Sequence, residues 1–103
     1  MNKTVLVIDD DDLLRTNLKR GLQQHEFSVL TAGSAEHGTQ ILARVSVDAI
    51  VLDRMMTGID GLSFLKNLRK SGNLTPVIML TAMSGADNAI DGLAGGANDY
   101  LAK

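Results

Sequence analysis

The stretch Val47-Asp48-Ala49-Ile50-Val51-Leu52-Asp53 decides the fold of this chain. Its four apolar residues, Ala49 to Leu52, follow one another without a break and end at a single carboxylate, Asp53. A short, continuous apolar run is typical of a strand that is buried on both faces, as in a parallel sheet. An acid at the carboxyl end of such a strand lies where open α/β sheets bind their ligands.

Two further runs have the same form. Val5 to Ile8 leads into Asp9, and Val77 to Leu80 leads into Thr81. Since the carboxyl ends of parallel strands meet at one edge of a sheet, these endings predict one polar site assembled there.

Length and composition restrict the class of protein. A chain of 103 residues is expected to form one domain, residues 1–103. Its net charge of −2 argues against direct binding to nucleic acid or to an anionic membrane, and the absence of cysteine excludes disulfides and thiolate metal sites. No apolar run approaches the roughly 18 residues of a membrane span, and the first is too short for a signal peptide, so we expect a cytoplasmic chain.

Strand patterns alternate with helix patterns, which predicts βαβ units and a parallel sheet. Strands are expected at residues 5–8, 27–31, 47–53, 77–80 and 100–102. A first helix has Leu14, Leu18 and Leu22 on its inner face and Arg15 off that face, with Asp11 or Asp12 as its N-cap. A second helix begins after Ser34, and a third has Leu62, Leu65 and Leu68 on its inner face. Residues 84–96 form a weaker helix, because its glycines each cost about 1 kcal/mol relative to alanine.

The strand ends gather five polar residues at one edge of this sheet: Asp9, Asp10, Asp53, Thr81 and Lys103. Three crowded carboxylates repel one another unless a cation neutralises them. Oxygen ligands with open positions suit Mg²⁺. A carboxylate beside Mg²⁺, with a hydroxyl and an ammonium close by, can accept a phosphoryl group as a nucleophile.

The chain resembles the receiver domain of two-component response regulators over nearly its whole length. The resemblance is carried by four motifs in family order: Val7-Ile8-Asp9-Asp10; Val51-Leu52-Asp53 with Gly58-Ile59-Asp60-Gly61; Pro76 to Ala82; and Gly96 to Lys103. Each motif is weak alone, but together they are highly specific. The resemblance implies an α/β, doubly wound, flavodoxin-like sheet of five parallel strands, in the order 2-1-3-4-5, with flanking helices.

The resemblance also implies a role for each site residue. Asp53 accepts a phosphoryl group from a sensor histidine kinase, so the chain is a regulatory phosphoacceptor and not an enzyme that turns over a substrate. Mg²⁺ is bound by Asp10, Asp53 and the backbone carbonyl of Met55, with Asp9 acting through water. Thr81 and Lys103 hold the phosphoryl group. Tyr100 then moves inward as Thr81 shifts, and the segment 84–96 moves with them.

Two departures from the family pattern are expected to matter. Thr57 stands where the loop after Asp53 often has proline, which makes that turn less rigid. The sequence stops at Lys103, where the family continues into a fifth helix and often an effector domain. We therefore expect a receiver domain truncated before its last helix, with an apolar sheet face that invites instability or a homodimer.

Two other functions remain open at this point. Asp9-Asp10-Asp11 also satisfies the D-x-D core of haloacid-dehalogenase-type phosphatases, with Asp9 as nucleophile, although Leu13 replaces an expected Thr or Val. The chain could also be a pseudo-receiver, an interaction module that is never phosphorylated. Labelling by acetyl phosphate separates the three hypotheses.

Overall fold

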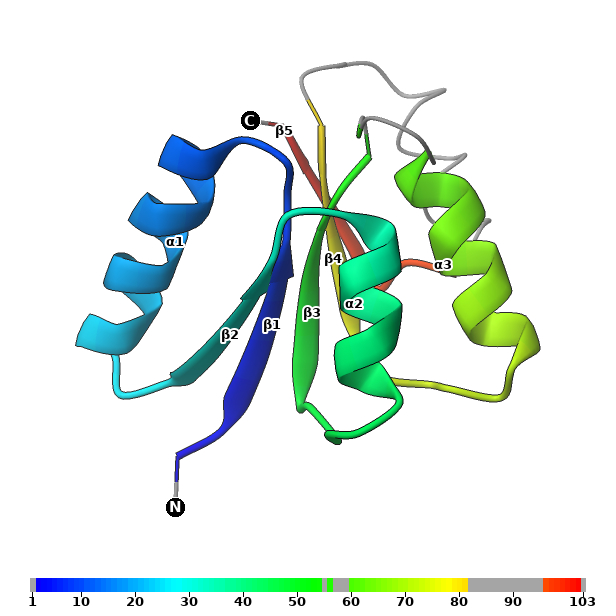
Figure 1. The fold of residues 1–103 in the computed structure, drawn as a ribbon, viewed down its shortest axis with the longest axis horizontal. Helices are drawn as coiled ribbons and strands as arrows, with labels where there is room; N and C mark the ends of the chain where they lie inside the picture. The colour runs from blue at the N-terminus through cyan, green and yellow to red at the C-terminus, as the bar shows by residue number, and fades with distance from the viewer. Residues whose placement is uncertain (1, 55, 57–59, 82–95, 103) are drawn as a thin grey trace.

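Parallel strands alternate with helices in the computed structural model. The structure describes residues 2–54, 56, 60–81 and 96–102, and for residues 81 and 100–102 it describes the backbone only. The described elements are β1 (Thr4–Ile8), α1 (Asp12–Gln24), β2 (Ser28–Ala32), α2 (Ala35–Leu42), β3 (Ala49–Asp53), α3 (Gly61–Lys70), β4 (Val77–Thr81) and β5 (Asp99–Ala102). Every strand pairing is parallel, and the five-stranded sheet has the order β2-β1-β3-β4-β5 (Figure 1). The predicted fold class and strand order are confirmed.

The strand boundaries differ slightly from the predicted ones. The third strand begins at Ala49 and not at Val47. Asp48, which precedes it, binds the start of β1. The backbone N–H of Thr4 donates to Asp48 Oδ2 at 2.7 Å, and the backbone N–H of Asp48 donates to the Thr4 carbonyl at 2.8 Å. The predicted helix over 84–96 lies outside the described residues except for Gly96, which is in a turn with φ of 111°.

Two helices begin at the caps that the sequence predicts. The Asp11 carboxylate accepts hydrogen bonds from the backbone N–H groups of Leu13 and Leu14, at 3.0 and 3.1 Å. The Ser34 hydroxyl oxygen accepts one from His37 at 3.1 Å. Each cap satisfies backbone donors that the first helical turn leaves without a partner in the helix.

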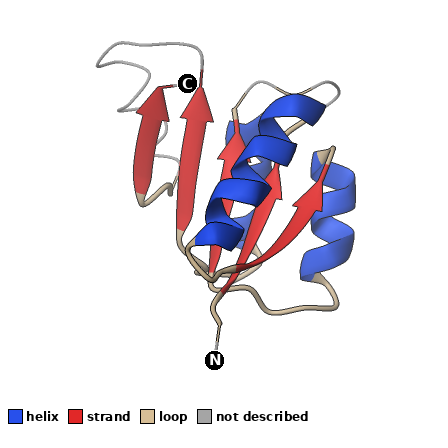
Figure 2. Ribbon diagram, turned by 90° about the vertical axis from the view of Figure 1, so that its left-hand side faces the viewer, coloured by secondary structure: helices blue, strands red, loops and turns tan. Residues whose placement is uncertain are grey.

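Helices cover both faces of the sheet, with α1 on one face and α2 and α3 on the other (Figures 1 and 2). The core lies mainly on the α2 and α3 side, where Leu6, Ile8, Ile50, Leu52, Phe64, Leu65, Val77 and Met79 are buried. Gly38 lets α2 approach closely, because a Cβ there would lie 2.6 Å from Ile8 Cδ1.

The face that carries α1 is covered unevenly. Val5 and Val7 are buried, whereas Val51, Ile78 and Leu80 are half-exposed. Side chains alternate between the faces of a strand, which places these residues opposite the core side. Among the described residues, this face of the sheet is thus less completely covered over β3 and β4 than over β1.

Arg69 ties the last turn of α3 to the approach of β5. Its guanidinium donates to the carbonyls of Asn73 and Thr75 at 3.1 and 2.7 Å. It also donates to the Gly96 carbonyl at 3.0 Å and to Asn98 Oδ1 at 3.1 Å. These bonds fix the chain just before β5, so Arg69 is a structural link between two distant segments.

Among the residues that the structure describes, none of the helices has the length and apolar character of a membrane span.

Candidate metal centre

Two carboxylates lie side by side at the carboxyl edge of the sheet, where β1 and β3 end. Ile8 pairs with Leu52, so the residues that follow them, Asp9 and Asp53, are neighbours across the two strands. Both side chains are buried, with only 1% of each residue exposed. Buried carboxylates are costly unless they are matched by hydrogen bonds or cations, so this pair is typical of a functional site.

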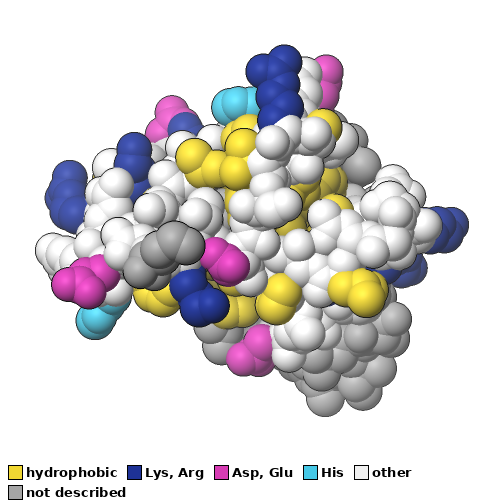
Figure 3. Space-filling view, turned by 90° about the horizontal axis from the view of Figure 1, so that it is seen from below, with side chains coloured by type: hydrophobic (Ala, Val, Ile, Leu, Met, Phe, Trp, Pro, Cys, Tyr) yellow, Lys and Arg dark blue, Asp and Glu magenta, His cyan; other side chains and the backbone are white. Residues whose placement is uncertain are grey.

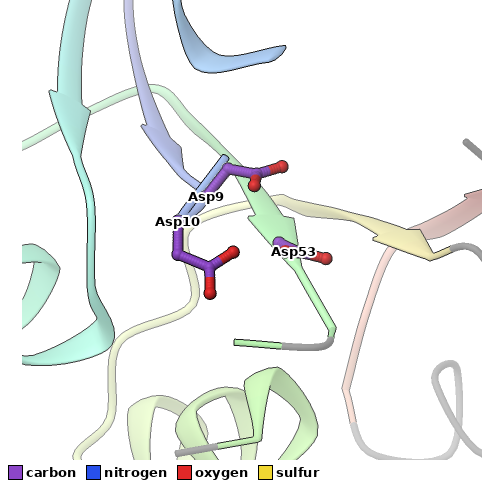
Figure 4. A group of neighbouring side chains, drawn as sticks. All are labelled: Asp9, Asp10 and Asp53. Atoms are coloured by element: carbon purple, nitrogen blue, oxygen red, sulfur yellow. The ribbon is translucent and has the colours of Figure 1, made fainter. Parts of the chain in front are cut away.

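A third acid completes the cluster. One carboxylate oxygen from each of Asp9, Asp10 and Asp53 lies within 4.8 Å of the others. Figure 4 shows the three side chains extending from the ends of the two adjacent strands toward a shared space. The structure therefore brings together three of the predicted site residues, with Asp9 and Asp53 buried and Asp10 exposed.

The cluster fits a hard divalent cation such as Mg²⁺. Carboxylate oxygens are preferred ligands of Mg²⁺, and two of them bound to one ion lie at most about 4.2 Å apart. The three oxygens, all within 4.8 Å of one another, therefore lie close enough together to surround one ion. An exposed member gives the ion a route to solvent, and Mg²⁺ usually keeps several waters.

The loop between β1 and α1 is held by short-range hydrogen bonds. The N–H of Asp9 donates to the Ala32 carbonyl at 3.1 Å, which extends the pairing with β2. The N–H of Asp11 donates to Asp9 Oδ1 at 2.9 Å. Asp11 thus has the structural role that the sequence predicts for it, and it also orients the Asp9 carboxylate.

Gly61 shapes the site from the other side, where α3 begins. Its N–H donates to the Arg54 carbonyl at 2.7 Å. A Cβ at Gly61 would lie 2.2 Å from the carbonyl oxygen of Asp53, far inside any permitted contact. Only glycine lets the first turn of α3 lie this close to the main chain of Asp53. In the sequence, Gly61 is only part of a loop motif, and no local pattern predicts this contact.

Of the remaining predicted site residues, the structure describes two by their backbone only and two not at all. Asp53 pairs with Leu80, and Thr81 pairs with Ala102, so Thr81 lies one position beyond the residue that pairs with Asp53. The side chains of Thr81 and Tyr100 lie outside what the structure describes, as do Met55 and Lys103 entirely.

Arg15, which the sequence pattern places off the apolar face of the first helix, lies near the site. Its Nη1 donates to the carbonyl oxygen of Asp9 at 2.7 Å, and its Nη2 forms an ion pair with Asp12. The sequence spacing does predict the ion pair, because Asp12 precedes Arg15 by three residues and side chains at that spacing meet on a helix.

Shape alone does not locate this site. A cavity of about 690 Å³ lies between α2 and α3, lined by residues such as Leu42, Phe64 and Leu68, away from the three acids. Seen from the amino-terminal edge of the sheet, apolar side chains are exposed among acidic and basic ones (Figure 3). The cluster of three acids lies at the opposite, carboxyl edge.

Comparison with known proteins gives a consistent result. The family described as "Response regulator receiver domain" matches residues 5–103. Transcriptional regulatory protein AfsQ1 of Streptomyces coelicolor is 40% identical over 100 residues, which are 97% of this chain and 44% of that protein. The chain therefore spans less than half the length of this curated relative.

Solved structures show the same similarity. The receiver domain of the Francisella response regulator 1452 has a TM-score of 0.96 and 37% identity, covering 99% of this chain and 84% of that one. TrrA of Thermotoga maritima, solved in complex with Mg²⁺–BeF, has a TM-score of 0.87 and 32% identity, covering 98% of this chain and 86% of that one.

Proposed function

Because the chain belongs to the response regulator receiver family of two-component systems, we propose that Asp53 accepts a phosphoryl group from the phosphohistidine of a sensor kinase. The observation that carries this proposal is the meeting of Asp9, Asp10 and Asp53 at the carboxyl edge of the sheet. Residues 1–103 then act as one receiver domain, a regulatory phosphoacceptor in the cytoplasm.

The transfer is a displacement at phosphorus. An oxygen of the Asp53 carboxylate forms a bond to phosphorus while the phosphorus–nitrogen bond of phosphohistidine breaks. The electron pair of that bond stays on the imidazole nitrogen, which takes up a proton from water. Asp53 becomes an acyl phosphate, and the rigid end of β3 holds its attacking oxygen in place.

Asp10 and Asp53 would bind Mg²⁺ directly, together with the backbone carbonyl of Met55, and Asp9 would act through water. When bound, the ion offsets the negative charge that builds up on the transferring group. The donor set supports this assignment, since all three carboxylates lie within reach of one ion and TrrA was solved with Mg²⁺–BeF.

Thr81 and Lys103 would hold the transferred phosphoryl group, the first by its hydroxyl and the second by its charge. The strand register supports these roles, because Thr81 and Ala102 pair at the same edge as Asp53. Tyr100 would respond to the shift of Thr81, so that phosphorylation moves an existing equilibrium between two conformations. Mg²⁺ with beryllofluoride should change the amide NMR spectrum of residues 81–100, and an unchanged spectrum would contradict this switch.

Acetyl phosphate with Mg²⁺ tests the acceptor directly. We expect mass spectrometry to show one phosphoryl group on Asp53 in the wild-type chain and none in Asp53→Asn. Glu36→Gln is a matched control, because Glu36 is an exposed acid in the first turn of α2, outside the acidic cluster. A label on Asp9 would support the phosphatase hypothesis instead, and an unlabelled wild-type chain would support the pseudo-receiver.

The output of the signal belongs to the whole protein. AfsQ1 is named a transcriptional regulatory protein, and the chain matches less than half of it. We propose that the receiver controls an effector domain or a partner, such as a second copy of itself, and does not contact DNA directly.

A further inference from the structure

Arg15 connects the two ends of the loop that carries Asp9 and Asp10, two of the three acids of the cluster. Its Nη1 donates to the carbonyl oxygen of Asp9, at the start of the loop, at 2.7 Å. Its Nη2 pairs with the carboxylate of Asp12, at the start of α1. The Arg15 side chain is 21% exposed, whereas that of Asp12 is 88% exposed. Arg15 is therefore partly enclosed and aimed at the loop instead of at solvent.

The β2–α2 loop encloses the guanidinium from a second side. A Cβ at Gly33 would lie 3.2 Å from Arg15 Nη1, closer than most side-chain contacts. The small residue at this position leaves room for the guanidinium, so its location depends on two loops at once.

The bond to the Asp9 carbonyl has a direct consequence for Asp10. The carbonyl oxygen of Asp9 and the backbone nitrogen of Asp10 belong to one rigid peptide plane. Holding that oxygen fixes the plane from which the Asp10 side chain extends. The Asp9 side chain is held separately, because its Oδ1 accepts the N–H of Asp11 at 2.9 Å.

We propose that Arg15 is a positioning residue for Mg²⁺: it orients the Asp9–Asp10 peptide so that the Asp10 carboxylate faces Asp9 and Asp53. This inference rests on the proposed function, since it takes the acidic cluster as the Mg²⁺ site. Arg15 acts through the ligands and does not touch the ion.

The two roles that Arg15 could have, as a nearby positive charge or as a positioning group, predict opposite effects of its removal on Mg²⁺ affinity. If Arg15 acted only as a nearby positive charge, its removal would reduce repulsion and strengthen Mg²⁺ binding. If it positions the loop, its removal weakens binding, typically by about 10-fold or more for a group that orients a ligand. The direction of the change therefore distinguishes the two roles.

The test is a titration of the purified chain with MgCl₂. Binding is measured by calorimetry and by the shifts of the amide NMR signals of Asp9, Asp10 and Asp53. We expect Arg15→Gln to weaken Mg²⁺ binding by about 10-fold. Arg15→Lys keeps the charge but cannot bridge two acceptors in fixed geometry, so it should also weaken binding several-fold. Arg20→Gln is the matched control, since it removes the same charge from an exposed position of α1 and should bind Mg²⁺ like the wild type.

The inference is overturned if Arg15→Gln binds Mg²⁺ as tightly as Arg20→Gln or more tightly, or if Arg15→Lys equals the wild type. A thermal melt confirms that each variant is folded, and Arg15→Lys gives the decision should Arg15→Gln unfold. Failure of the proposed function has a different result, because the wild-type chain itself would then bind no Mg²⁺.

Discussion

Replacing Gly61 with alanine tests how closely the start of α3 must approach the acceptor strand. The new Cβ would lie 2.2 Å from the Asp53 carbonyl oxygen and 2.8 Å from Arg54 Cα. Real Cβ atoms essentially never approach other atoms within 3.0 Å, so the two backbone segments must separate by at least about 0.8 Å. Neither neighbour is a flexible side chain, and the backbone itself has to move.

The magnitude follows from two effects. Overpacking in a tightly packed region costs about 1 to 3 kcal/mol. The hydrogen bond from the Gly61 N–H to the Arg54 carbonyl, 2.7 Å long, would stretch and lose up to about 1 kcal/mol. We therefore expect Gly61→Ala to lower the free energy of unfolding by roughly 1 to 4 kcal/mol. A displacement of Asp53 near 1 Å should also slow its phosphorylation by about 100-fold.

Urea unfolding measures the first effect, and the rate of labelling by acetyl phosphate with Mg²⁺ measures the second. Gly21→Ala is the matched control, because a Cβ at this exposed position of α1 meets nothing within 4 Å. It should raise the free energy of unfolding by up to about 1 kcal/mol and leave the labelling rate unchanged. The reasoning is refuted if Gly61→Ala unfolds and is labelled like the wild type.

Two further substitutions and the lifetime of the phosphoryl group have expected outcomes. Arg69→Gln should lower the free energy of unfolding by about 2 to 4 kcal/mol, because it removes most of the four hydrogen bonds of the guanidinium. Lys66→Gln, at an exposed position of the same helix, is the control. An equally small effect of both substitutions would contradict the structural role of Arg69. Glu26 has a φ of 68°, a backbone conformation that favours glycine. Glu26→Gly should therefore raise the free energy of unfolding by up to about 1 kcal/mol, seen as a higher midpoint of thermal unfolding. A lower midpoint would argue against backbone strain at this position. The phosphoryl group on the wild-type chain should be lost slowly, because Met55 and Met83, two residues after Asp53 and Thr81 in the sequence, offer no polar side chain to orient an attacking water. A decay within seconds in a radiolabel assay would count against this.

Much of the fold could be predicted because its signals are local. A run of four apolar residues that ends at a polar one marks each of the strands β1, β3 and β4. The caps at Asp11 and Ser34 were readable for the same reason, since each side chain bonds to backbone N–H groups only two or three residues away. The third strand is two residues shorter than predicted, and no local pattern reports the contact that Asp48 makes with Thr4, 44 residues away in the sequence.

The convergence of Asp9 and Asp53 was also determined by sequence, through topology. Each acid ends a buried strand, and parallel strands that are neighbours must bring their carboxyl ends to one edge. The distance within which the three carboxylates lie, and which of them is exposed, could not be read in this way. Those quantities depend on the register between strands and on the path of the loop after β1.

The order of the elements, the class of the sheet and the acids that meet at its edge follow from local sequence patterns. What holds those acids in place depends on contacts between separate elements. Arg15 lies off the apolar face of its own helix, yet it bonds to Asp9 and lies close to Gly33. Gly61 looked like one glycine in a loop, yet it touches the main chain of Asp53. The physical reason is that periodicity reports only which face of an element is apolar, whereas these contacts join separate elements whose spacing is set when the whole sheet packs.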